Sequence, residues 1–337
     1  MKDWYKLLPD SKLEVSEEEL HEFFSTMYER QCIWKRRFIE RKERPWTKNV
    51  ILRDNKFTNV YRELDRSSQW EIKNIILDDT LSLTNLIWKI LVYRTFNNLQ
   101  TFEVGIKLGY KNGIVDFEDY DEEEFYNFIR SVRNDYGLNP FTSSYFIHPG
   151  IGHDREYNYS HRTIPELHNI VPKLISIANT ANRPEEIIEI LNSVTYVSDF
   201  ISHEYYQDFT YIERYTDKQF MPFNQNDFTN VGDGADLGIR LIFPDTRPKN
   251  RKGRIYDLLG IAELYLQKIG ECYDEPMPYV RWNKEKSEYE IVDKCNLTLH
   301  QIEMWLCEYG KYWKMKHAVG KQRSKYIVEQ GNTAMIK

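Results

Sequence analysis

The sequence predicts a mainly α-helical protein with two packed lobes and one small β-hairpin. Of its 337 residues, 41% are hydrophobic and 15% aromatic, so the chain can bury a sizeable core, and its length exceeds that of most single domains. Apolar residues recur at helical spacing along most of the chain, and residues 279–292 predict paired strands around a charged turn. We expect an N-terminal extension over residues 1–15 and a helical domain over residues 16–330 whose two lobes share an interface.

The first predicted helix begins at a capping box formed by Ser16 and Glu19. Apolar residues follow at helical spacing, and Pro45 ends the pattern because proline cannot continue the hydrogen-bond ladder. The C-terminal half of this segment is basic, so it could form a positive ridge that contacts DNA phosphates, or simply a solvated helix end. The candidate DNA-contacting residues here are Arg36, Arg37, Arg41 and Trp46.

Further helices are predicted from their start signals and apolar spacing. Thr58 can cap a helix over residues 59–66, and the apolar segment 81–96 predicts a central helix. The other predicted helices cover residues 119–133, 163–179, 184–192, 196–209, 236–243 and 297–313. Residues 245–253 are polar and basic, which favours a mobile loop.

Composition and missing motifs exclude several classes of protein. The net charge is −6, so any contact with nucleic acid must use a local basic patch. No apolar run is long enough to cross a membrane, which predicts a soluble, cytoplasmic protein. The four cysteines lie far apart without a CxxC pair, the histidines are dispersed, and no GxxxxGK[ST] loop occurs. We therefore expect reduced thiols, no dedicated metal centre and no P-loop.

Residues 57–66 carry more polar side chains than a core needs. On a helix, spacings of three and four would bring arginines and carboxylates into adjacent rows that can bind an anion beside a proton acceptor. A lattice of intrahelical salt bridges is the alternative. The candidate site residues in this segment are Asn59, Tyr61, Arg62, Glu63, Asp65 and Arg66.

Two more segments are rich in functional side chains. Glu204 and Asp208 are four residues apart, so burial would raise the pKa of one and suit it to proton transfer, whereas exposure would leave the pair inert. A glycine turn then precedes a helix and could bring backbone N–H groups to an anion, unless it serves only as a helix entry. The candidate residues around this turn and in the C-terminal segment are Gly232, Gly234, Arg240, Glu308, Lys311 and Arg323.

These segments resemble the α-glutamyl/putrescinyl thymine pyrophosphorylases, or amino acid:DNA transferases, of thymine-hypermodifying phages. They are also similar to the helical module fused to phage 5-hydroxymethyluracil DNA kinases. The resemblance spans roughly residues 20–326. It rests on residues 28–37 (YERQCIWKRR), 45–52 (PWTKNVIL), 57–66 (FTNVYRELDR), 231–239 (VGDGADLGI) and 302–312 (IEMWLCEYGKY).

The resemblance implies a standalone transferase that displaces pyrophosphate from an activated 5-hydroxymethyluracil in double-stranded DNA with an amino acid or a polyamine. The base would have to leave the stack. Arg62, Arg66 and Arg240 would bind the pyrophosphate, and Asp65, or else Glu204 or Asp208, would take the proton of the amine. Lys311 or Arg323 would pair with the carboxylate of an amino-acid substrate.

The resemblance also implies a functional link to a 5-hydroxymethyluracil DNA kinase, which would activate the base, and a place in the cytoplasm of the phage host. No cofactor is required, although a loosely held Mg²⁺ could assist the leaving pyrophosphate. The implied fold is similar to helix-hairpin-helix DNA glycosylases. A base-flipping glycosylase of modified pyrimidines and a noncatalytic reader of hypermodified DNA are therefore the alternative functions.

Overall fold

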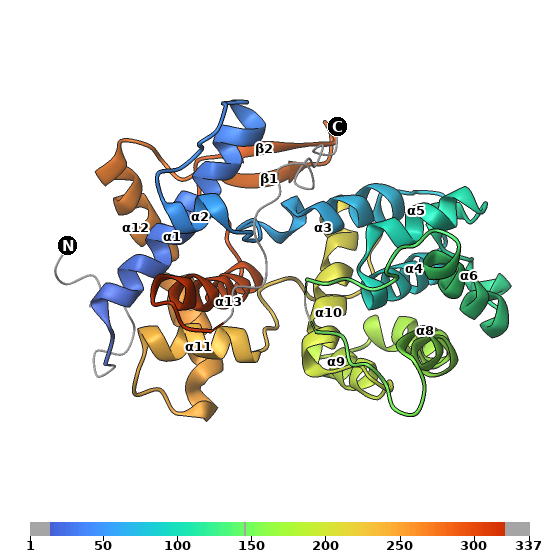
Figure 1. Cartoon of the computed structure of the whole chain (residues 1–337). Coiled ribbons are helices and arrows are strands. Elements are labelled where there is room, and N and C mark those ends of the chain that lie inside the picture. Colours follow the sequence, from blue (N-terminus) through green and yellow to red (C-terminus); the bar gives the residue numbers. More distant parts are fainter. Residues whose placement is uncertain (1–13, 145, 321–337) are drawn as a thin grey trace. The chain divides into compact units, whose positions relative to one another are not determined.

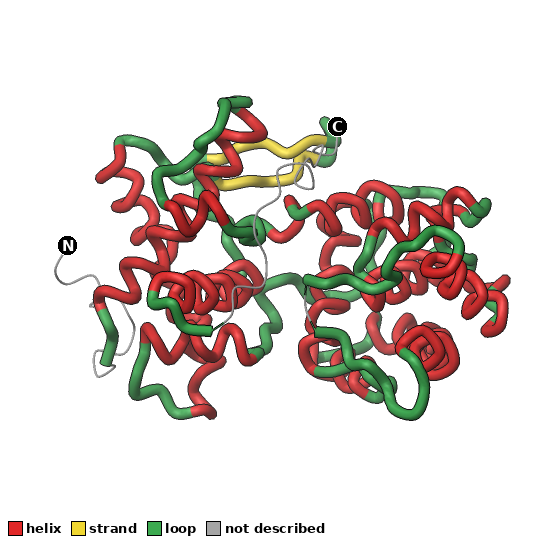
Figure 2. The backbone as a smooth tube through the Cα atoms, in the orientation of Figure 1, coloured by secondary structure: helices red, strands yellow, loops and turns green. Residues whose placement is uncertain are grey.

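The computed structural model describes residues 14–144 and 146–320, and these residues are mainly helical with one two-stranded sheet (Figures 1 and 2). The chain divides into two compact units. Unit 1 combines Met1–Arg66 with Thr229–Lys337, and unit 2 is Ser67–Phe228. Segments from the first fifth and the last third of the sequence therefore fold together, and the middle of the chain forms a core of its own.

Unit 1 contains five α-helices of the described chain, three short helical turns and the sheet. In chain order these are α1 (Glu17–Trp34), the π-helical turn η2 (Lys35–Ile39), α2 (Val50–Asp54), the 3-10 turn η3 (Arg62–Leu64), α11 (Asp233–Ile242), the 3-10 turn η8 (Pro248–Asn250), α12 (Arg251–Tyr273), β1 (Tyr279–Asn283), β2 (Glu288–Val292) and α13 (Leu299–Lys316).

Helix α1 begins where the sequence predicts, because the Ser16 hydroxyl accepts the backbone N–H of Glu19 at 3.4 Å. The Glu19 side chain turns to α13, where it accepts hydrogen bonds from Tyr309 and Trp313. Rings fill the space between α1 and its neighbours, and Phe24 stacks on Tyr265 of α12 with centroids 4.7 Å apart. The apolar stripe of α1 therefore forms the centre of the core of unit 1.

Strands β1 and β2 form the predicted antiparallel hairpin, which confirms the strand pair. Trp282 lies opposite Tyr289, and the two rings meet edge to face at 5.0 Å. Tyr289 also donates to the carbonyl of Glu63 at 3.5 Å. The sheet thus supports the segment before α3 (Arg66–Glu71).

Unit 2 is built around α4 (Leu83–Phe96), which is buried from Leu86 to Phe96. The predicted central helix is confirmed. The other elements of unit 2 are α3, the π-helical turn η4 (Ile72–Ile76), α5 (Leu99–Lys107), the 3-10 turns η5 (Lys111–Gly113) and η6 (Phe117–Asp119), α6 (Glu122–Asn134), α7 (Arg155–Asn158), the π-helical turn η7 (Tyr159–Thr163), α8 (Ile164–Ala178), α9 (Pro184–Asn192) and α10 (Asp199–Tyr215).

Two charged residues lie inside the buried part of α4, and each is compensated. Lys89 donates to the carbonyls of Lys111 and Ile114 at 2.9 and 2.6 Å and pairs with Asp116 at 2.7 Å. Burial lowers the pKa of Lys89, and the Asp116 carboxylate opposes this effect. The second charged residue is Arg94, which organises a carboxylate cluster described below.

The structure corrects several predicted boundaries. The expected loop over residues 245–253 is wrong at its C-terminal end, because η8 and α12 already begin at Pro248 and Arg251. The predicted helices at 196–209 and 236–243 exist, but they begin at Asp199 and Asp233, after caps at Ser198 and Gly232. Helix α12 was not among the predicted helices, and it packs its apolar face against α1 and α13.

Candidate active site

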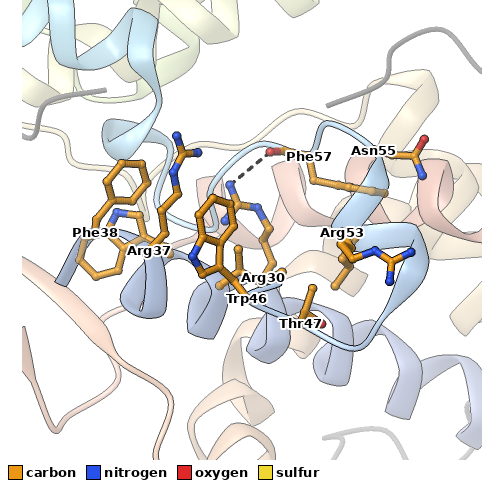
Figure 3. Close-up of a pocket in the computed structure, with 11 residues that line it drawn as sticks. Arg30, Arg37, Phe38, Trp46, Thr47, Arg53, Asn55 and Phe57 are labelled. Atoms are coloured by element: carbon orange, nitrogen blue, oxygen red, sulfur yellow. Dashed lines mark hydrogen bonds between the residues drawn. The ribbon is translucent and has the colours of Figure 1, made fainter. Parts of the chain in front are cut away.

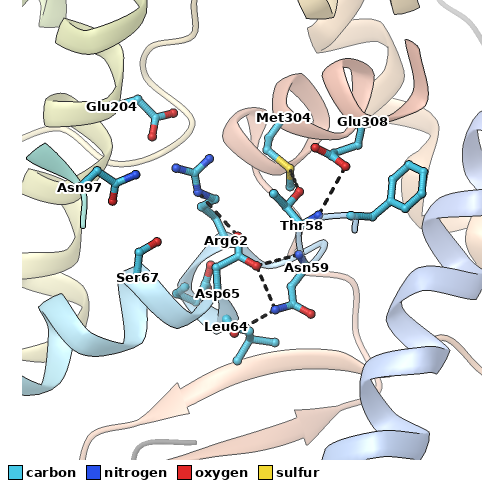
Figure 4. A network of polar contacts seen from close by, with 12 residues as sticks. Thr58, Asn59, Arg62, Leu64, Asp65, Ser67, Asn97, Glu204, Met304 and Glu308 are labelled. Carbon is cyan, nitrogen blue, oxygen red and sulfur yellow. Dashed lines mark hydrogen bonds and ion pairs between the residues drawn. The ribbon is translucent and has the colours of Figure 1, made fainter. Parts of the chain in front are cut away.

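Residues 57–66 form a loop in unit 1, so the helix predicted for them is wrong. The Asp65 carboxylate accepts the backbone N–H of Asn59 at 2.9 Å and its carboxamide N–H at 3.0 Å, and the same carboxamide donates to the carbonyl of Leu64 at 2.8 Å (Figure 4). Side chains thus replace the hydrogen bonds that a helix would have made. Within this segment, only η3 and Arg66, the first residue of α3, are helical.

Buried residues hold the loop in place. Val60 and Tyr61 are fully buried, and the Tyr61 hydroxyl donates to Asn296 at 2.5 Å. Glu63 is also buried, and its carbonyl accepts a hydrogen bond from Tyr289 of the hairpin. The predicted helical pairing of Arg62 with Arg66 does not form, since η3 ends at Leu64 and Arg66 starts the next helix.

Arg62 instead lies beside Asp65, with Nε 3.7 Å from Oδ2. Burial raises the pKa of Asp65 to about 6, although the charges of Arg62 and Arg30 and the N–H of Asn59 oppose this effect. The side chain is still 17% exposed, so it can exchange a proton with a ligand or with water. A carboxylate with this pKa is suited to act as a general base near neutral pH.

Glu308 and Lys311 of α13 border the same loop. Glu308 Oε2 accepts the backbone N–H of Thr58 at 3.4 Å (Figure 4). The same carboxylate oxygen pairs with Lys311 at 3.0 Å. Lys311 also donates to the carbonyl of Lys56 and lies 4.4 Å from the centre of the Phe57 ring. The negative charge of Glu308 further raises the pKa of Asp65. Five predicted site residues are therefore close together: Asn59, Arg62, Asp65, Glu308 and Lys311.

A pocket of about 460 Å³, part of it open to solvent, lies next to this loop (Figure 3). Its wall includes four rings and three guanidinium groups: Trp34, Phe38, Trp46, Phe57, Arg30, Arg37 and Arg53. Arg30 donates to the carbonyl of Phe57 at 3.3 Å and to Asn59 Oδ1 at 2.7 Å. It therefore joins the pocket to the Asp65 loop through Asn59.

Arg30 is not among the site residues predicted from sequence, although its position carries a signal. Arg30 follows Met27 by three residues and precedes Trp34 by four, and both of these are buried. A charge at this spacing on an apolar helical stripe indicates either an internal ion pair or a site.

The basic segment after Trp34 is not one continuous helical ridge. Arg36 pairs with Glu29 at 3.1 Å and Glu275 at 2.9 Å and donates to the carbonyl of Trp46. These contacts hold the Trp46 turn against α1. Arg41 lies beyond η2, is exposed and has a left-handed φ of 52°. A phosphate contact by Arg36, Arg37 or Arg41 stays a prediction.

Glu204 and Asp208 lie in unit 2, where both are buried on α10. Asp208 accepts from Nε and Nη2 of Arg94 at 2.5 and 2.6 Å, and Glu204 lies 3.5 Å from Nη1. Glu71 is 3.1 Å from the same guanidinium. Arg94 therefore binds three buried carboxylates from two segments of unit 2. Arg94 and Glu71 did not figure among the predicted site residues.

The glycine turn before α11 has a packing role in addition to the predicted helix entry. A Cβ at Gly234 would lie 2.9 Å from Sγ of Cys307, and one at Gly238 would lie 2.6 Å from the carbonyl oxygen of Leu306. These glycines allow α11 to approach α13 closely. Gly232 caps α11, and an anion contact there stays a prediction.

Other predicted site features have different outcomes. Arg240 is half exposed and pairs with Asp236 at 3.0 Å. Arg323 lies outside the described residues. Within the described ranges, no group of three or more His, Cys, Asp or Glu side chains is arranged to hold a metal ion. No helix in the described part of the chain is long and apolar enough to span a membrane.

Comparison with known proteins identifies the family. Residues 17–322 match the family described as 5-hmdU DNA kinase, helical domain. The chain is 27% identical over 304 residues to a 5-hmdU DNA kinase of Bacillus phage SP10, and this match covers 86% of the chain but 44% of the relative. The chain therefore spans less than half the length of that relative. No solved structure matches significantly. The chain belongs to the 5-hmdU DNA kinase helical domain family.

Proposed function

We propose that this chain is a DNA-modifying transferase that acts in phage thymine modification. Its substrate would be DNA in which 5-hydroxymethyl-deoxyuridine carries a pyrophosphate on the methylene oxygen, and an amine would replace that pyrophosphate. Family membership supports a role in DNA modification. The observation that carries the finer proposal is Asp65, a partly exposed carboxylate with a pKa of about 6, held beside Arg62.

The reaction needs a neutral amine, since an ammonium has no free electron pair. The amine nitrogen attacks the C5 methylene carbon, a C–N bond forms, and the C–O bond to pyrophosphate breaks with its electron pair leaving on the pyrophosphate. Asp65 takes the proton that the nitrogen loses, which makes it the general base. Glu204 and Asp208 are less suited to this role because Arg94 already binds both carboxylates.

Charged neighbours of Asp65 suit the other reactants. Arg62 would stabilise the negative charge that develops on the leaving pyrophosphate. Glu308 would attract the cationic form of the amine before it loses its proton, and Lys311 would pair with the carboxylate of an amino-acid substrate. A Mg²⁺ held by the pyrophosphate itself would add charge stabilisation. Arg66 and Arg240 are further candidates for the pyrophosphate.

The direct test supplies a duplex with pyrophosphorylated 5-hydroxymethyl-deoxyuridine and a pool of glycine, serine, glutamate and putrescine. We expect an amine-dependent new nucleoside by mass spectrometry and one pyrophosphate released for each nucleoside formed. Abasic sites without pyrophosphate would indicate a glycosylase. Binding of the duplex without any product would indicate a reader of modified DNA.

The energy source gives a second test of the same proposal. The pyrophosphate ester is already activated, so the reaction needs no ATP. A separate 5-hydroxymethyluracil DNA kinase would supply the activated base, which is the proposed functional link. Unactivated 5-hydroxymethyl-deoxyuridine DNA should give no product with amine, with or without ATP. Product from that DNA only in the presence of ATP would mean that the chain activates its own substrate, and the transferase-only proposal would fail.

A further inference from the structure

The pocket beside the Asp65 loop combines flat apolar surfaces with positive charge. Arg37 lies between Phe38 and Trp46 in Figure 3, with its guanidinium carbon 4.6 Å from the first ring centre and 5.0 Å from the second. The space bounded by these side chains is about 460 Å³ when its solvent-open part is included. The described residues that line it include three arginines and no carboxylate.

This combination fits one nucleotide better than an amine. Asp54 already pairs with Arg53 at 2.7 Å, but Arg30 and Arg37 lie in a wall whose described residues include no carboxylate. This wall therefore offers a cationic amine no partner of opposite charge. A nucleotide offers a flat base for the rings and a phosphate for the arginines. Stacking of a base on aromatic side chains contributes about 1–3 kcal/mol per base and tolerates different bases.

We infer that this pocket receives the pyrimidine base of one nucleotide that has left the DNA stack. Trp46 and Phe38 stack on the base, and Arg37 moves from between these rings toward the flanking phosphate. Arg30 bonds to Asn59, whose amide groups donate to Asp65, so two hydrogen-bonded residues connect the pocket to the proposed general base. The inference rests on the proposed function for the identity of the target base, whereas the capture of a flipped base can be tested without any reaction.

The first test measures binding and unstacking in the full chain. A duplex carries the modified base with 2-aminopurine as its neighbour, and the fluorescence of 2-aminopurine rises when the target leaves the stack. Trp46→Ala should weaken DNA binding by about tenfold or more and abolish the fluorescence rise, because the flipped base loses one stacking partner. Trp46→Phe keeps a ring and should restore most of both signals. Trp313→Ala removes a half-buried indole of α13 outside the pocket and should change neither.

The second test maps the contact directly. A duplex with 5-iodouracil at the target position is irradiated in complex with the wild-type chain, and the adduct is located by peptide mass spectrometry. We expect adducts on Trp46 or Phe38. Adducts only outside residues 30–57, or an unchanged fluorescence rise in Trp46→Ala, would overturn the inference.

The two proposals can fail separately. Pocket adducts and a fluorescence rise without release of pyrophosphate would sustain the base pocket and remove the transferase. Normal pyrophosphate release by Trp46→Ala, together with adducts elsewhere, would sustain the transferase and remove the base pocket.

Discussion

Replacing Asp65 with asparagine should reduce activity and raise stability. In the folded chain burial raises the pKa of Asp65 to about 6 from an ordinary value of 3.8. This difference of about 2 pH units, at about 1.4 kcal/mol per unit, means that ionising the carboxyl costs about 3 kcal/mol more in the folded than in the unfolded chain. The carboxylate therefore lowers the free energy of unfolding at neutral and alkaline pH.

The direction of the pH dependence follows from this raised pKa. Above pH 6 the carboxyl is ionised in both states and the full cost is present, whereas below pH 3.8 it is protonated in both and the cost is absent. Asp65→Asn has no such cost. Its advantage in stability over the wild type should be greatest near pH 8 and should disappear as the pH falls toward 4. This figure already includes the attraction between the carboxylate and Arg62, which opposes the rise in pKa.

Urea unfolding at pH 8 and pH 5, followed by tryptophan fluorescence, measures this difference. Asp293→Asn is the matched control, because Asp293 is an exposed aspartate of the same unit and should show no pH-dependent gain.

Asp65→Asn should also lower the transfer rate by about 100-fold or more, the range expected when a general base is lost. A variant that is less stable than the wild type at pH 8 and transfers at the wild-type rate would refute both parts of the reasoning.

Three further predictions concern charge and packing. Arg94→Met should lower the free energy of unfolding by about 3–5 kcal/mol in urea, because it leaves buried carboxylates without their guanidinium. Gly238→Ala should destabilise the chain by about 1–3 kcal/mol through contact with α13, whereas Gly260→Ala, which meets no neighbour, should stabilise it by up to about 1 kcal/mol in thermal unfolding. Arg41→Glu should weaken DNA binding and reduce its log-log salt slope by about 1, while Arg36→Glu should lower stability more than affinity because it breaks two ion pairs. Equal salt slopes in Arg41→Glu and the wild type would show that Arg41 is only solvated.

The sequence predicts most of the helical fold because strong local signals agree with the packing. The cap at Ser16, the apolar run of α4 and the strand pair around residues 284–287 all lie where the pattern places them. Helix α12 shows the limit of this approach. Its basic start and its glycines favour a loop locally, yet Ile255, Leu258 and Ile261 are buried, so tertiary packing overrides the weak propensity.

The residues of the candidate site also differ in how far the sequence alone can identify them. Arg62 and Asp65 can be chosen from sequence because they are close along the chain. Arg94 cannot be paired with Asp208 from sequence, because 114 residues separate them and only the packing of α4 against α10 brings them together. Arg30 is an intermediate case, since its place on a buried stripe is visible, whereas its bond to Asn59 depends on a loop that the pattern does not predict.

The failed helix prediction at residues 57–66 has a physical cause that also bears on function. A helix would have spread its charged side chains over a solvent-facing surface and satisfied its backbone internally. In the loop, Asn59 and Asp65 bond to the backbone instead, and Tyr61 is buried beneath them. The carboxylate is thereby held in an environment that raises its pKa, at a cost in stability. Departures from local backbone propensity that reduce stability are expected where a residue takes part in chemistry. The loop at residues 57–66 is such a departure, and it therefore supports a functional role for Asp65.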